Sequence, residues 1–316
     1  MSAATGDPGG RRLARTPLEQ VPRPLRDALD AAGLDPADVH AVVAAAFAED
    51  CPGDDVTSWP TLPVVRSTAD LVARADGVVA GLAVAELAFV YALGADHRAV
   101  EVVQVRRDGD HVVRGDVLLT ATGDVGLLLT AERTALNLLC HLSGVATATA
   151  AWEAALAGTG CRVRDTRKTV PGLRHLEKYA VRAGGGLNHR TSLSDQALVK
   201  DNHVLACGGV VAAYEAVLAA YPGLPVQVEV TTLDQLDELL AVGAPDILLD
   251  NMSAEQMREA VRRTAGRARL EASGGLTLER AAEVARTGVD TIAVGALTHS
   301  APVLDIAMDL RDQPTA

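Results

Sequence analysis

The sequence is poor in aromatic residues and has neither a long apolar run nor an overall positive charge. Aromatic side chains make up only 3% of the 316 residues, so there is little on which the bases of a single-stranded nucleic acid would stack. No apolar run reaches the roughly 20 residues that cross a membrane, and residues 1–15 contain arginines but no apolar signal-peptide core. We therefore expect a cytoplasmic globular protein that binds neither nucleic acid nor membrane.

Cysteine is also scarce, and its spacing excludes the common sulfur-ligated sites. The four cysteines form no C-x-x-C pair and no zinc-ligand pattern, which predicts free thiols in a reducing compartment and no protein-bound metal centre. No G-x-G-x-x-G follows an apolar run, so a dinucleotide-binding fold has little support.

Positive charge is concentrated in one stretch of an otherwise acidic chain. The formal net charge is −12, but residues 162–203 contain nine Lys or Arg against four Asp or Glu, a net +5 that leaves −17 for the rest. A nucleic-acid-binding protein usually carries its positive charge across a whole domain. This stretch instead predicts a focused pocket for a small, highly charged anion.

The cations of this stretch fall into two groups. Arg167-Lys168 and Lys200 end strand-like apolar runs, where an unpaired charge is costly unless an anion meets it. Arg174, Lys178 and Arg182 are spaced four residues apart, which suits an exposed helix face as well as a binding site.

After Cys161, short apolar runs alternate with amphipathic helical segments. Six strands are expected, at residues 162–168, 197–200, 226–230, 247–250, 268–273 and 291–295. Parallel strands joined by helices build either an α/β barrel or a doubly wound sheet. Most of these strands end in a polar residue: Lys168, Lys200, Glu229, Asp250 and Ser273. Because the carboxyl ends of barrel strands meet at one mouth, where active sites lie, this pattern favours the barrel.

The first half of the chain has a different pattern. Between residues 68 and 122, short strand-like runs alternate with turns that include Asp-Gly pairs, which predicts an antiparallel sheet with one helix near residues 84–93. A long helix is expected at residues 127–156, where apolar residues recur every three or four positions. These features predict an α+β domain in which no chemistry is visible.

The loops after the last two barrel strands are rich in glycine: Ser273-Gly274-Gly275 and Val294-Gly295-Ala296. Late loops of a barrel commonly bind phosphate through backbone N–H groups, which glycine lets approach closely. Glu229 and Asp250 suit ribose hydroxyls or a hydrated Mg²⁺, and they equally suit ion pairs with the lysines. With the cations, these groups suggest phosphoribosyl transfer to an anionic acceptor.

Several blocks of distinctive composition run through the chain. They are residues 53–57 (GDDVT), 132–137 (ERTALN), 165–169 (DTRKT), 184–190 (GGGLNHR), 200–203 (KDNH), 249–252 (LDNM) and 272–275 (ASGG). These blocks closely resemble those of the quinolinate phosphoribosyltransferase family, and the match covers nearly the whole chain past residue 20. The DTRKT and GGGLNHR blocks are the most specific.

The resemblance implies a fold and an assembly. An N-terminal α/β sandwich domain is expected at residues 17–138, and an incomplete α/β barrel, with the active site at the C-terminal ends of its strands, at residues 139–300. A disordered tail, residues 1–16, would precede them, and a helix and tail, residues 301–316, would follow. The family pattern also implies a homodimer, or a higher oligomer built from it, in which each active site borrows residues from the partner subunit.

The resemblance also implies an activity: phosphoribosyl transfer from phosphoribosyl pyrophosphate to quinolinate with decarboxylation, in NAD biosynthesis, with Mg²⁺ bound to the pyrophosphate substrate. By matching position, quinolinate carboxylates and phosphates would be bound by Arg133 (reaching across the dimer), Arg167, Lys168, His189, Arg190 and Lys200. Glu229 and Asp250 would hold the ribose, and Ser273, Gly274 and Gly295 the 5′-phosphate. The expected catalytic residues are Lys168, Lys200, Glu229 and Asp250.

Other functions stay open at this point. Lys200 at a strand end suits a Schiff-base aldolase, although the surplus of Arg and His argues against it. A ModD-type relative, associated with molybdate transport, would share the architecture but use a different acceptor. A phosphate-binding regulatory module would bind anions without releasing pyrophosphate.

Overall fold

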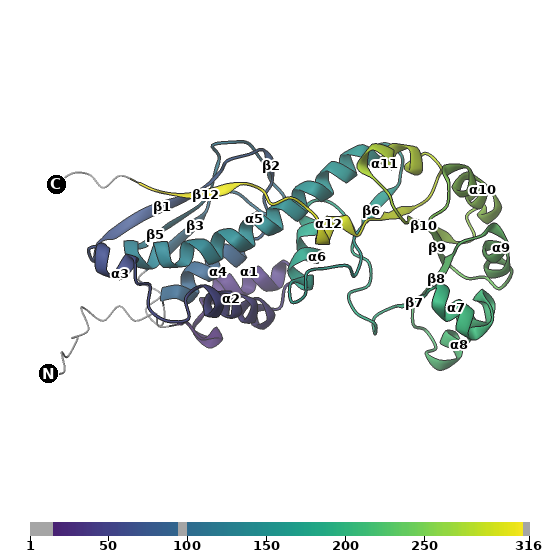
Figure 1. Cartoon of the computed structure of the whole chain (residues 1–316), viewed down its shortest axis with the longest axis horizontal. Coiled ribbons are helices and arrows are strands. Elements are labelled where there is room, and N and C mark those ends of the chain that lie inside the picture. The colour runs from purple at the N-terminus through teal and green to yellow at the C-terminus, as the bar shows by residue number, and fades with distance from the viewer. Residues whose placement is uncertain (1–14, 94–99, 312–316) are drawn as a thin grey trace. The chain divides into compact units, whose positions relative to one another are not determined.

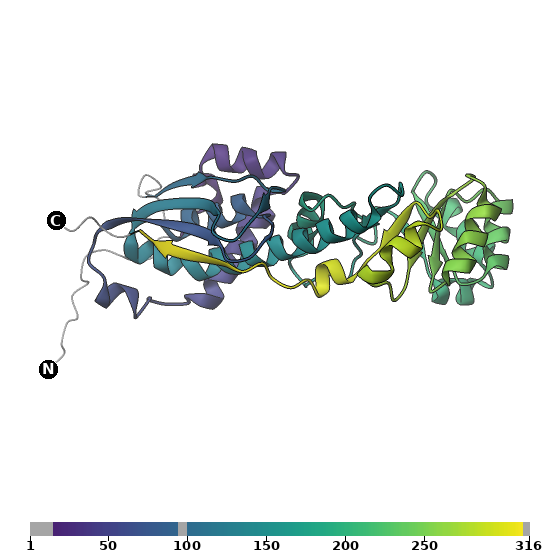
Figure 2. The same cartoon turned by 90° about the horizontal axis from the view of Figure 1, so that it is seen from above.

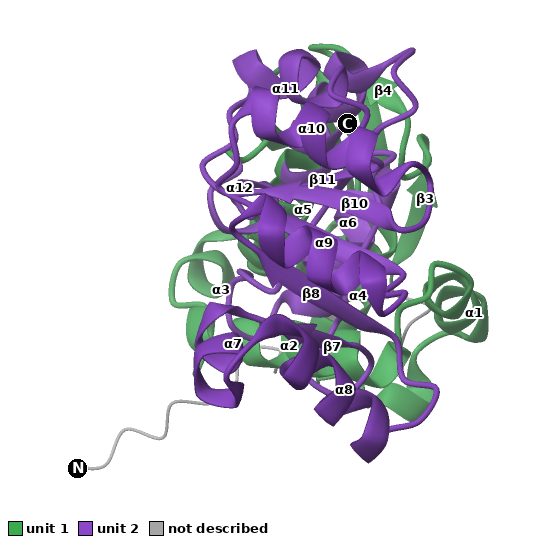
Figure 3. Cartoon of the chain, turned by 90° about the vertical axis from the view of Figure 1, so that its right-hand side faces the viewer, with its two compact units in different colours: residues 1–144, 302–316 green, residues 145–301 purple. Residues whose placement is uncertain are grey.

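The computed structural model describes residues 15–93 and 100–311. The chain divides into two compact units, which are coloured separately in Figure 3. Unit 1 comprises residues 1–144 and 302–316, and unit 2 comprises residues 145–301. In the described part of the chain no single helix is long and apolar enough to cross a membrane, although the bent pair 201–207 and 210–220 passes by length and composition.

Unit 1 contains a four-stranded antiparallel sheet in the order β12-β1-β5-β3. Its strands are β1 (Arg66–Ala73), β3 (Glu101–Gln104), β5 (Val117–Asp124) and β12 (Ile306–Leu310), and β2 (Gly77–Val78) pairs separately with β4 (His111–Val112). Side chains alternate between the two faces of a strand, and in β1 every second residue from Ser67 to Ala73 is buried. The antiparallel sheet expected between residues 68 and 122 is therefore confirmed.

The helices of unit 1 pack beside this sheet (Figure 1). They are η1 (Leu18–Gln20), α1 (Arg23–Ala31), α2 (Pro36–Asp50), α3 (Ser58–Thr61) and α4 (Leu82–Leu93). Helix α4 contacts β5, α1 and α2, and because it is apolar except at Glu86 most of it is buried. Helix α2 begins where Pro36 supplies the first helical residue and Asp35 accepts a hydrogen bond from the Ala37 amide at 2.8 Å.

Both ends of the described chain differ from expectation. The helix expected within residues 301–316 is wrong, because residues 306–310 form strand β12, seen in yellow in Figure 2. It pairs with β1, about 240 positions away, and Arg311 Nε lies 2.8 Å from Asp70 Oδ2; no local pattern reveals a partner so distant. Of the expected tail 1–16, residues 1–14 lie outside the described residues, whereas Thr16 is buried and donates to the Val90 carbonyl at 2.7 Å.

The long helix α5 (Val125–Leu156) confirms the helix expected at residues 127–156. Its residues up to Gly144 belong to unit 1 and those from Val145 to unit 2. Asp124 begins the helix by accepting hydrogen bonds from the amides of Gly126 and Leu127 at 2.9 and 3.2 Å. The apolar stripe expected from the spacing is buried throughout: Leu128, Ala131, Ala135, Leu138, Leu142 and Val145.

Unit 2 contains a six-stranded parallel sheet in the order β6-β11-β10-β9-β8-β7. The strands are β6 (Arg162–Arg164), β7 (Ala197–Val199), β8 (Val226–Val230), β9 (Asp246–Asp250), β10 (Arg269–Ser273) and β11 (Thr291–Ala293). The helices are α6 (Arg174–Ala183), α7 (Asp201–Cys207), α8 (Val210–Ala220), α9 (Leu233–Ala241), α10 (Ala254–Thr264), α11 (Leu278–Ala285) and α12 (Ala296–His299). Helices α9 and α10 lie on the outer side of β8 and β9 (Figure 1).

The barrel is incomplete, as expected, because its first two strands are the two edges of the sheet. β6 and β7 do not pair with each other; beyond its pairing with β11, β6 makes only an isolated bridge between Arg164 and Leu187. Three strands end earlier than expected, so Lys168, Lys200 and Gly295 lie just beyond their strands. After β6 the backbone amide of Asp165 donates to the Leu187 carbonyl at 3.1 Å, and its carboxylate accepts from the His189 amide.

Candidate active site

The carboxyl ends of the barrel strands surround a cavity of 280 Å³. It is lined by Thr166, Arg167, Lys168, His189, Arg190, Leu198, Lys200, Glu229, Leu248, Glu271, Ser273 and Ala293. All of these residues belong to unit 2. Seven of them were expected from the sequence to bind substrate, so the structure brings these residues together although they are up to 106 positions apart in the chain.

The loop after β6 places Arg167 and Lys168 at this cavity. The Lys168 amide donates to Thr166 Oγ1 at 3.0 Å, and the hydroxyl of Thr298 donates to the Lys168 carbonyl at 2.8 Å. Arg174 holds the same loop from α6, because its Nε donates to Thr169 Oγ1 at 3.0 Å. Arg174, which the spacing left open between surface and site, therefore supports the site without lining the cavity.

The positive charges of Arg167 and Arg190 affect each other. Burial lowers the pKa of Arg190, and the positive charge of Arg167 lowers it further. Arg190 Nη1 donates to the Gln196 carbonyl at 3.0 Å, whereas Arg167 Nε is buried and has no hydrogen-bond partner among the described residues. Two guanidinium groups so arranged repel each other until an anion lies between them.

A buried ion pair fixes the loop that carries Arg190. Lys178 donates to Asp165 and also to the His189 carbonyl at 2.9 Å, and Asp165 Oδ1 accepts from the His189 amide at 2.8 Å. Burial raises the pKa of Asp165 and lowers that of Lys178, while each opposes the shift of the other. Lys178, also left open by the sequence, is therefore a structural residue of the interior.

Lys200 and Glu229 face each other at the ends of β7 and β8. Lys200 Nζ lies 3.8 Å from Glu229 Oε2, and the Lys200 side chain is half exposed. Burial raises the pKa of Glu229, which the charge of Lys200 opposes and the charges of Asp250 and Asp201 reinforce. A contact of 3.8 Å is compatible with both interpretations of Glu229. The carboxylate can be an ion-pair partner of Lys200, or it can bind a substrate group at the mouth.

Asp250, Gly274 and Gly295 lie near the mouth but do not line the cavity. Asp250 ends β9 opposite Ser273 of β10, and its Oδ2 accepts from Asn251 Nδ2 at 2.7 Å. Gly274 has a φ of +96°, and a Cβ there would lie 2.2 Å from Asn251 Oδ1. A Cβ on Gly295 would lie 3.0 Å from Lys168 Cδ, so both glycines leave space that any side chain would fill.

Arg133 is a further expected site residue that does not line the cavity. It is exposed on the part of α5 that belongs to unit 1. Its expected role requires a second subunit, so the structure of one chain leaves that role a prediction.

Sequence reasoning missed the polar residues below the mouth. Gln227 and Glu271 lie in the middle of β8 and β10 and are almost completely buried. Burial opposes the ionisation of Glu271, but the nearby ring of His189, with Nε2 3.4 Å from Oε1, and the charge of Arg164 outweigh burial and hold the pKa of Glu271 below its ordinary value. The signal in the sequence is a polar residue inside an otherwise apolar strand.

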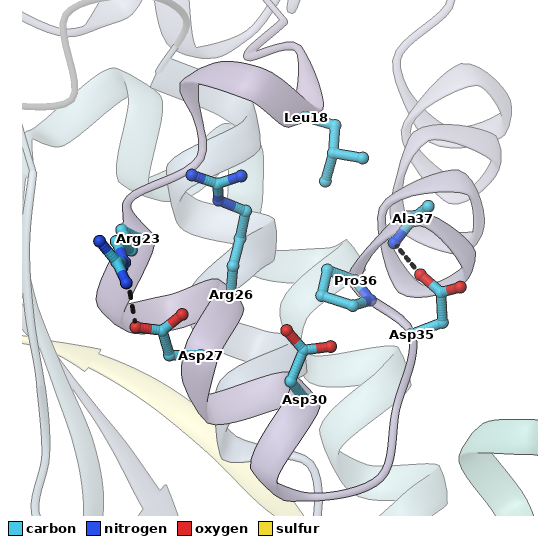
Figure 4. Close-up of a pocket in the computed structure, with 8 residues that line it drawn as sticks. All are labelled: Leu18, Arg23, Arg26, Asp27, Asp30, Asp35, Pro36 and Ala37. Atoms are coloured by element: carbon cyan, nitrogen blue, oxygen red, sulfur yellow. Dashed lines mark hydrogen bonds and ion pairs between the residues drawn. The ribbon is translucent and has the colours of Figure 1, made fainter.

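A second cavity, of 320 Å³, lies in unit 1 between α1 and α2 (Figure 4). Its charged residues partly neutralise one another, since Arg23 Nε lies 3.5 Å from Asp27 Oδ2 and Asp35 caps α2. Within the described ranges there is also no group of three or more His, Cys, Asp or Glu residues arranged to hold a metal ion. The cation-lined cavity of unit 2 is therefore the candidate active site.

Comparison with known proteins finds relatives of both units. A family model described as the C-terminal domain of quinolinate phosphoribosyl transferase matches residues 145–309, and the model of the N-terminal domain matches residues 55–143. The nicotinate-nucleotide pyrophosphorylase (carboxylating) of Mycobacterium leprae is 52% identical over 262 residues, which cover 82% of this chain and 92% of the relative. The probable nicotinate-nucleotide pyrophosphorylase (carboxylating) of Bacillus subtilis is 40% identical over 265 residues, covering 84% and 90%.

Solved structures give the same result. The crystal structure of NadC from Streptococcus pyogenes superposes with a TM-score of 0.83 at 40% identity, covering 88% of this chain and 98% of that one. Similarity therefore extends over both units and not over the barrel alone. The chain belongs to the quinolinate phosphoribosyl transferase family.

Proposed function

We propose that this protein transfers the phosphoribosyl group of phosphoribosyl pyrophosphate to quinolinate and releases pyrophosphate and CO₂, giving nicotinate mononucleotide. Family membership supports this activity, as do relatives named nicotinate-nucleotide pyrophosphorylase. The observation that carries the proposal is the charge of the cavity. Four cationic side chains line it, whereas Glu271, one of its two carboxylates, is already paired with Arg164 at 2.6 Å.

This surplus of positive charge matches the two substrates. Quinolinate has two adjacent carboxylates, and phosphoribosyl pyrophosphate has a 5′-phosphate and a pyrophosphate. Arginine binds carboxylates and phosphates through two parallel hydrogen bonds, and lysine acts as a point charge. We assign Arg167, Arg190, Lys168 and Lys200 to these anions.

The remaining assignments follow from position at the mouth. The carboxylates of Glu229 and Asp250 would accept hydrogen bonds from the ribose hydroxyls. Ser273, Gly274 and Gly295 would hold the 5′-phosphate, since a loop without side chains lets backbone N–H groups approach an oxyanion. His189 was also expected to bind substrate, and its ring nitrogens are considered below.

The chemistry requires charge stabilisation at two stages. As the bond from C1′ to the pyrophosphate oxygen breaks, the pyridine nitrogen attacks C1′ from the opposite face. The bond from C2 to its carboxylate then breaks, CO₂ leaves, and the electron pair stays at C2 until a proton from solvent replaces the lost group. Fixed positive charge from Lys168 and Lys200, together with the ring cation, would stabilise this carbanion.

Mg²⁺ is expected to arrive with the pyrophosphate. In such sites it keeps several water ligands and needs only one or two carboxylates besides the substrate phosphates. Glu229 and Asp250, on neighbouring strands, fit this requirement. The bound ion would neutralise charge on the leaving pyrophosphate.

A direct assay tests the activity. The protein mixed with quinolinate, phosphoribosyl pyrophosphate and Mg²⁺ should form nicotinate mononucleotide, and nicotinate should not replace quinolinate because it lacks the second carboxylate. Lys168→Ala and Lys200→Ala should each lower turnover by orders of magnitude. Near-normal rates in both variants would remove the assignment, and trapping of a carbonyl substrate on Lys200 by borohydride would favour an aldolase instead.

We also propose a homodimer in which Arg133 of one subunit completes the active site of the other. The exposed position of Arg133 on α5 supports this arrangement. Arg133→Ala and Lys168→Ala should each be inactive alone, and mixing the two should restore part of the activity through hybrid dimers with one intact site. No recovery in demonstrated hybrids would contradict a shared site. The cytoplasmic location and assembly beyond a dimer stay predictions.

A further inference from the structure

Both ring nitrogens of His189 are occupied by the protein itself. The ring is buried, with 7% of the residue exposed. Nδ1 lies 2.7 Å from the backbone nitrogen of Arg190, and Nε2 lies 2.8 Å from Gln227 Oε1. A histidine that gripped an anionic substrate would need one of these nitrogens free to donate.

The direction of each hydrogen bond follows from the groups that can only donate or only accept. The amide of Arg190 donates, so His189 Nδ1 must accept. Gln227 Nε2 lies 3.0 Å from Asp246 Oδ1, and Asp246 Oδ2 lies 2.5 Å from Arg269 Nη2. Asp246 is thus an acceptor, Gln227 presents its amide group to it, and the Gln227 carbonyl is left to accept from His189 Nε2.

Glu271 reinforces this arrangement from the other side. Its Oε2 accepts from Arg164 Nη1 at 2.6 Å and from Thr291 Oγ1 at 3.0 Å. Its Oε1 lies 3.4 Å from His189 Nε2 but accepts no hydrogen bond from the described residues. The single Nε2–H is donated to Gln227 instead. A carboxylate oxygen beside Nε2 favours a proton on that nitrogen.

We propose that His189 is a positioning residue that acts on the main chain of Arg190 and not on the substrate, and that Gln227, Asp246 and Glu271 hold it in the neutral Nε2–H tautomer. This inference deepens the proposed function, on which its kinetic test rests. The chain of hydrogen bonds runs from the Arg190 amide through His189 and Gln227 to the carboxylate of Asp246. Asp246 begins β9, at the end opposite to the mouth. Residues remote from the cavity would thereby hold the main chain from which the Arg190 side chain extends into the cavity lining.

A matched pair of substitutions separates the two roles of the ring. In His189→Asn the side-chain oxygen takes the place of Nδ1, and in His189→Gln the amide takes the place of Nε2. We expect His189→Asn to keep the KM for quinolinate within a few-fold of the parent. His189→Gln should raise it by roughly tenfold or more, because the Arg190 amide loses its acceptor. The reverse order would overturn the proposal, since it would place the important contact at Nε2.

A measurement without substrate keeps the inference distinct from the proposed activity. In ¹⁵N NMR spectra of histidine-labelled protein, the signal that disappears in His189→Asn should be that of a neutral ring with the proton on Nε2. Gln227→Leu and Glu271→Gln should each change the chemical shift of the Nε2–H, because they remove its acceptor or the carboxylate beside it, whereas the exposed His203→Asn should leave the signal unchanged. A proton on Nδ1, or a ring cation at neutral pH, would overturn the proposal even if the enzyme proved active.

Discussion

Lys200 and Glu229 form a loose ion pair across the mouth of the cavity, with 3.8 Å between Nζ and Oε2. The pair is unequal, because 48% of the lysine side chain is exposed but only 11% of the glutamate side chain. Water solvates the lysine, whereas the glutamate is largely desolvated and has poor compensation at this distance. Such a pair can exchange its partners for substrate groups at low cost.

Glu229→Gln should therefore raise stability at neutral pH while it lowers activity. Since burial raises the pKa of Glu229, folding disfavours its ionised form, and the parent loses stability as pH rises above the ordinary value of 4.5. The variant should melt at an equal or higher temperature than the parent at pH 7, and the difference should vanish below pH 4.5. Thermal unfolding at the two pH values measures this, with the exposed Glu238→Gln as control. A lower melting temperature at pH 7 would contradict it.

Lys178→Met should destabilise the protein strongly. It removes the partner of Asp165, which is fully buried, and also the donor to the His189 carbonyl. Breaking a buried ion pair on one side costs about 3–5 kcal/mol. Urea unfolding followed by circular dichroism measures the change, and Lys168→Met, at an exposed lysine of the same segment, is the control that should alter stability little. Equal effects of the two substitutions would show that the buried pair is not structural.

Asp195→Asn should loosen the loop after Arg190. Burial tends to raise the pKa of Asp195, but the amides of Thr191 and Ser192, at 2.6 and 2.9 Å, outweigh it and lower the pKa to about 2. The carboxylate contributes this stability above its ordinary value of 3.8, and the contribution is lost as pH falls through about 2.

Hydrogen exchange measures this loop directly. At neutral pH, the amides of Thr191 and Ser192 should exchange faster in Asp195→Asn than in the parent, and amides of β9 should be unchanged. Equal protection of the two loop amides in both proteins would show that the carboxylate does not order the loop.

Gly274→Ala should impair the binding of phosphoribosyl pyrophosphate. The added Cβ meets the Asn251 side chain at 2.2 Å, on a backbone with φ of +96°, so both the loop and its hydrogen bonds must shift. Gly266→Ala is a matched control, because its φ is +77° but nothing lies within 4 Å of the new Cβ. Both should lose some stability from backbone strain, but only Gly274→Ala should raise the KM for phosphoribosyl pyrophosphate, by roughly tenfold or more. A parallel change in Gly266→Ala would attribute the effect to strain alone.

Local sequence was enough to predict most helices and strands of the barrel and several residues of the cavity. The alternation of apolar strands and amphipathic helices, with polar residues at the strand ends, favoured an α/β barrel, because period and caps are short-range properties. That the barrel is incomplete was implied by the resemblance to the family. The strand-end rule located Lys200, Glu229 and Ser273 correctly, since parallel strands bring their carboxyl ends to one edge. Arg167 was also indicated by its place at the end of a strand-like run, whereas His189 and Arg190 were identified through the resemblance of their block to a known family.

The pairing of segments that are distant in the chain could not be predicted from local sequence. Residues 306–310 form a strand because β1 presents a free edge to them, and that edge is about 240 positions away in the chain. Lys178 had the spacing of a surface residue, yet the fold places Asp165 against it in the interior.

Residue type and order therefore indicated the barrel and its cationic mouth, since strands, helices and the positive charge of residues 162–203 are visible in the local sequence. Folding alone assigned Lys178 to a buried pair, Gln227 and Glu271 to the ring of His189, and β12 to the first sheet. The physical reason is common to all three: a desolvated polar group or an open strand edge is stabilised only by the partner that the completed fold brings to it.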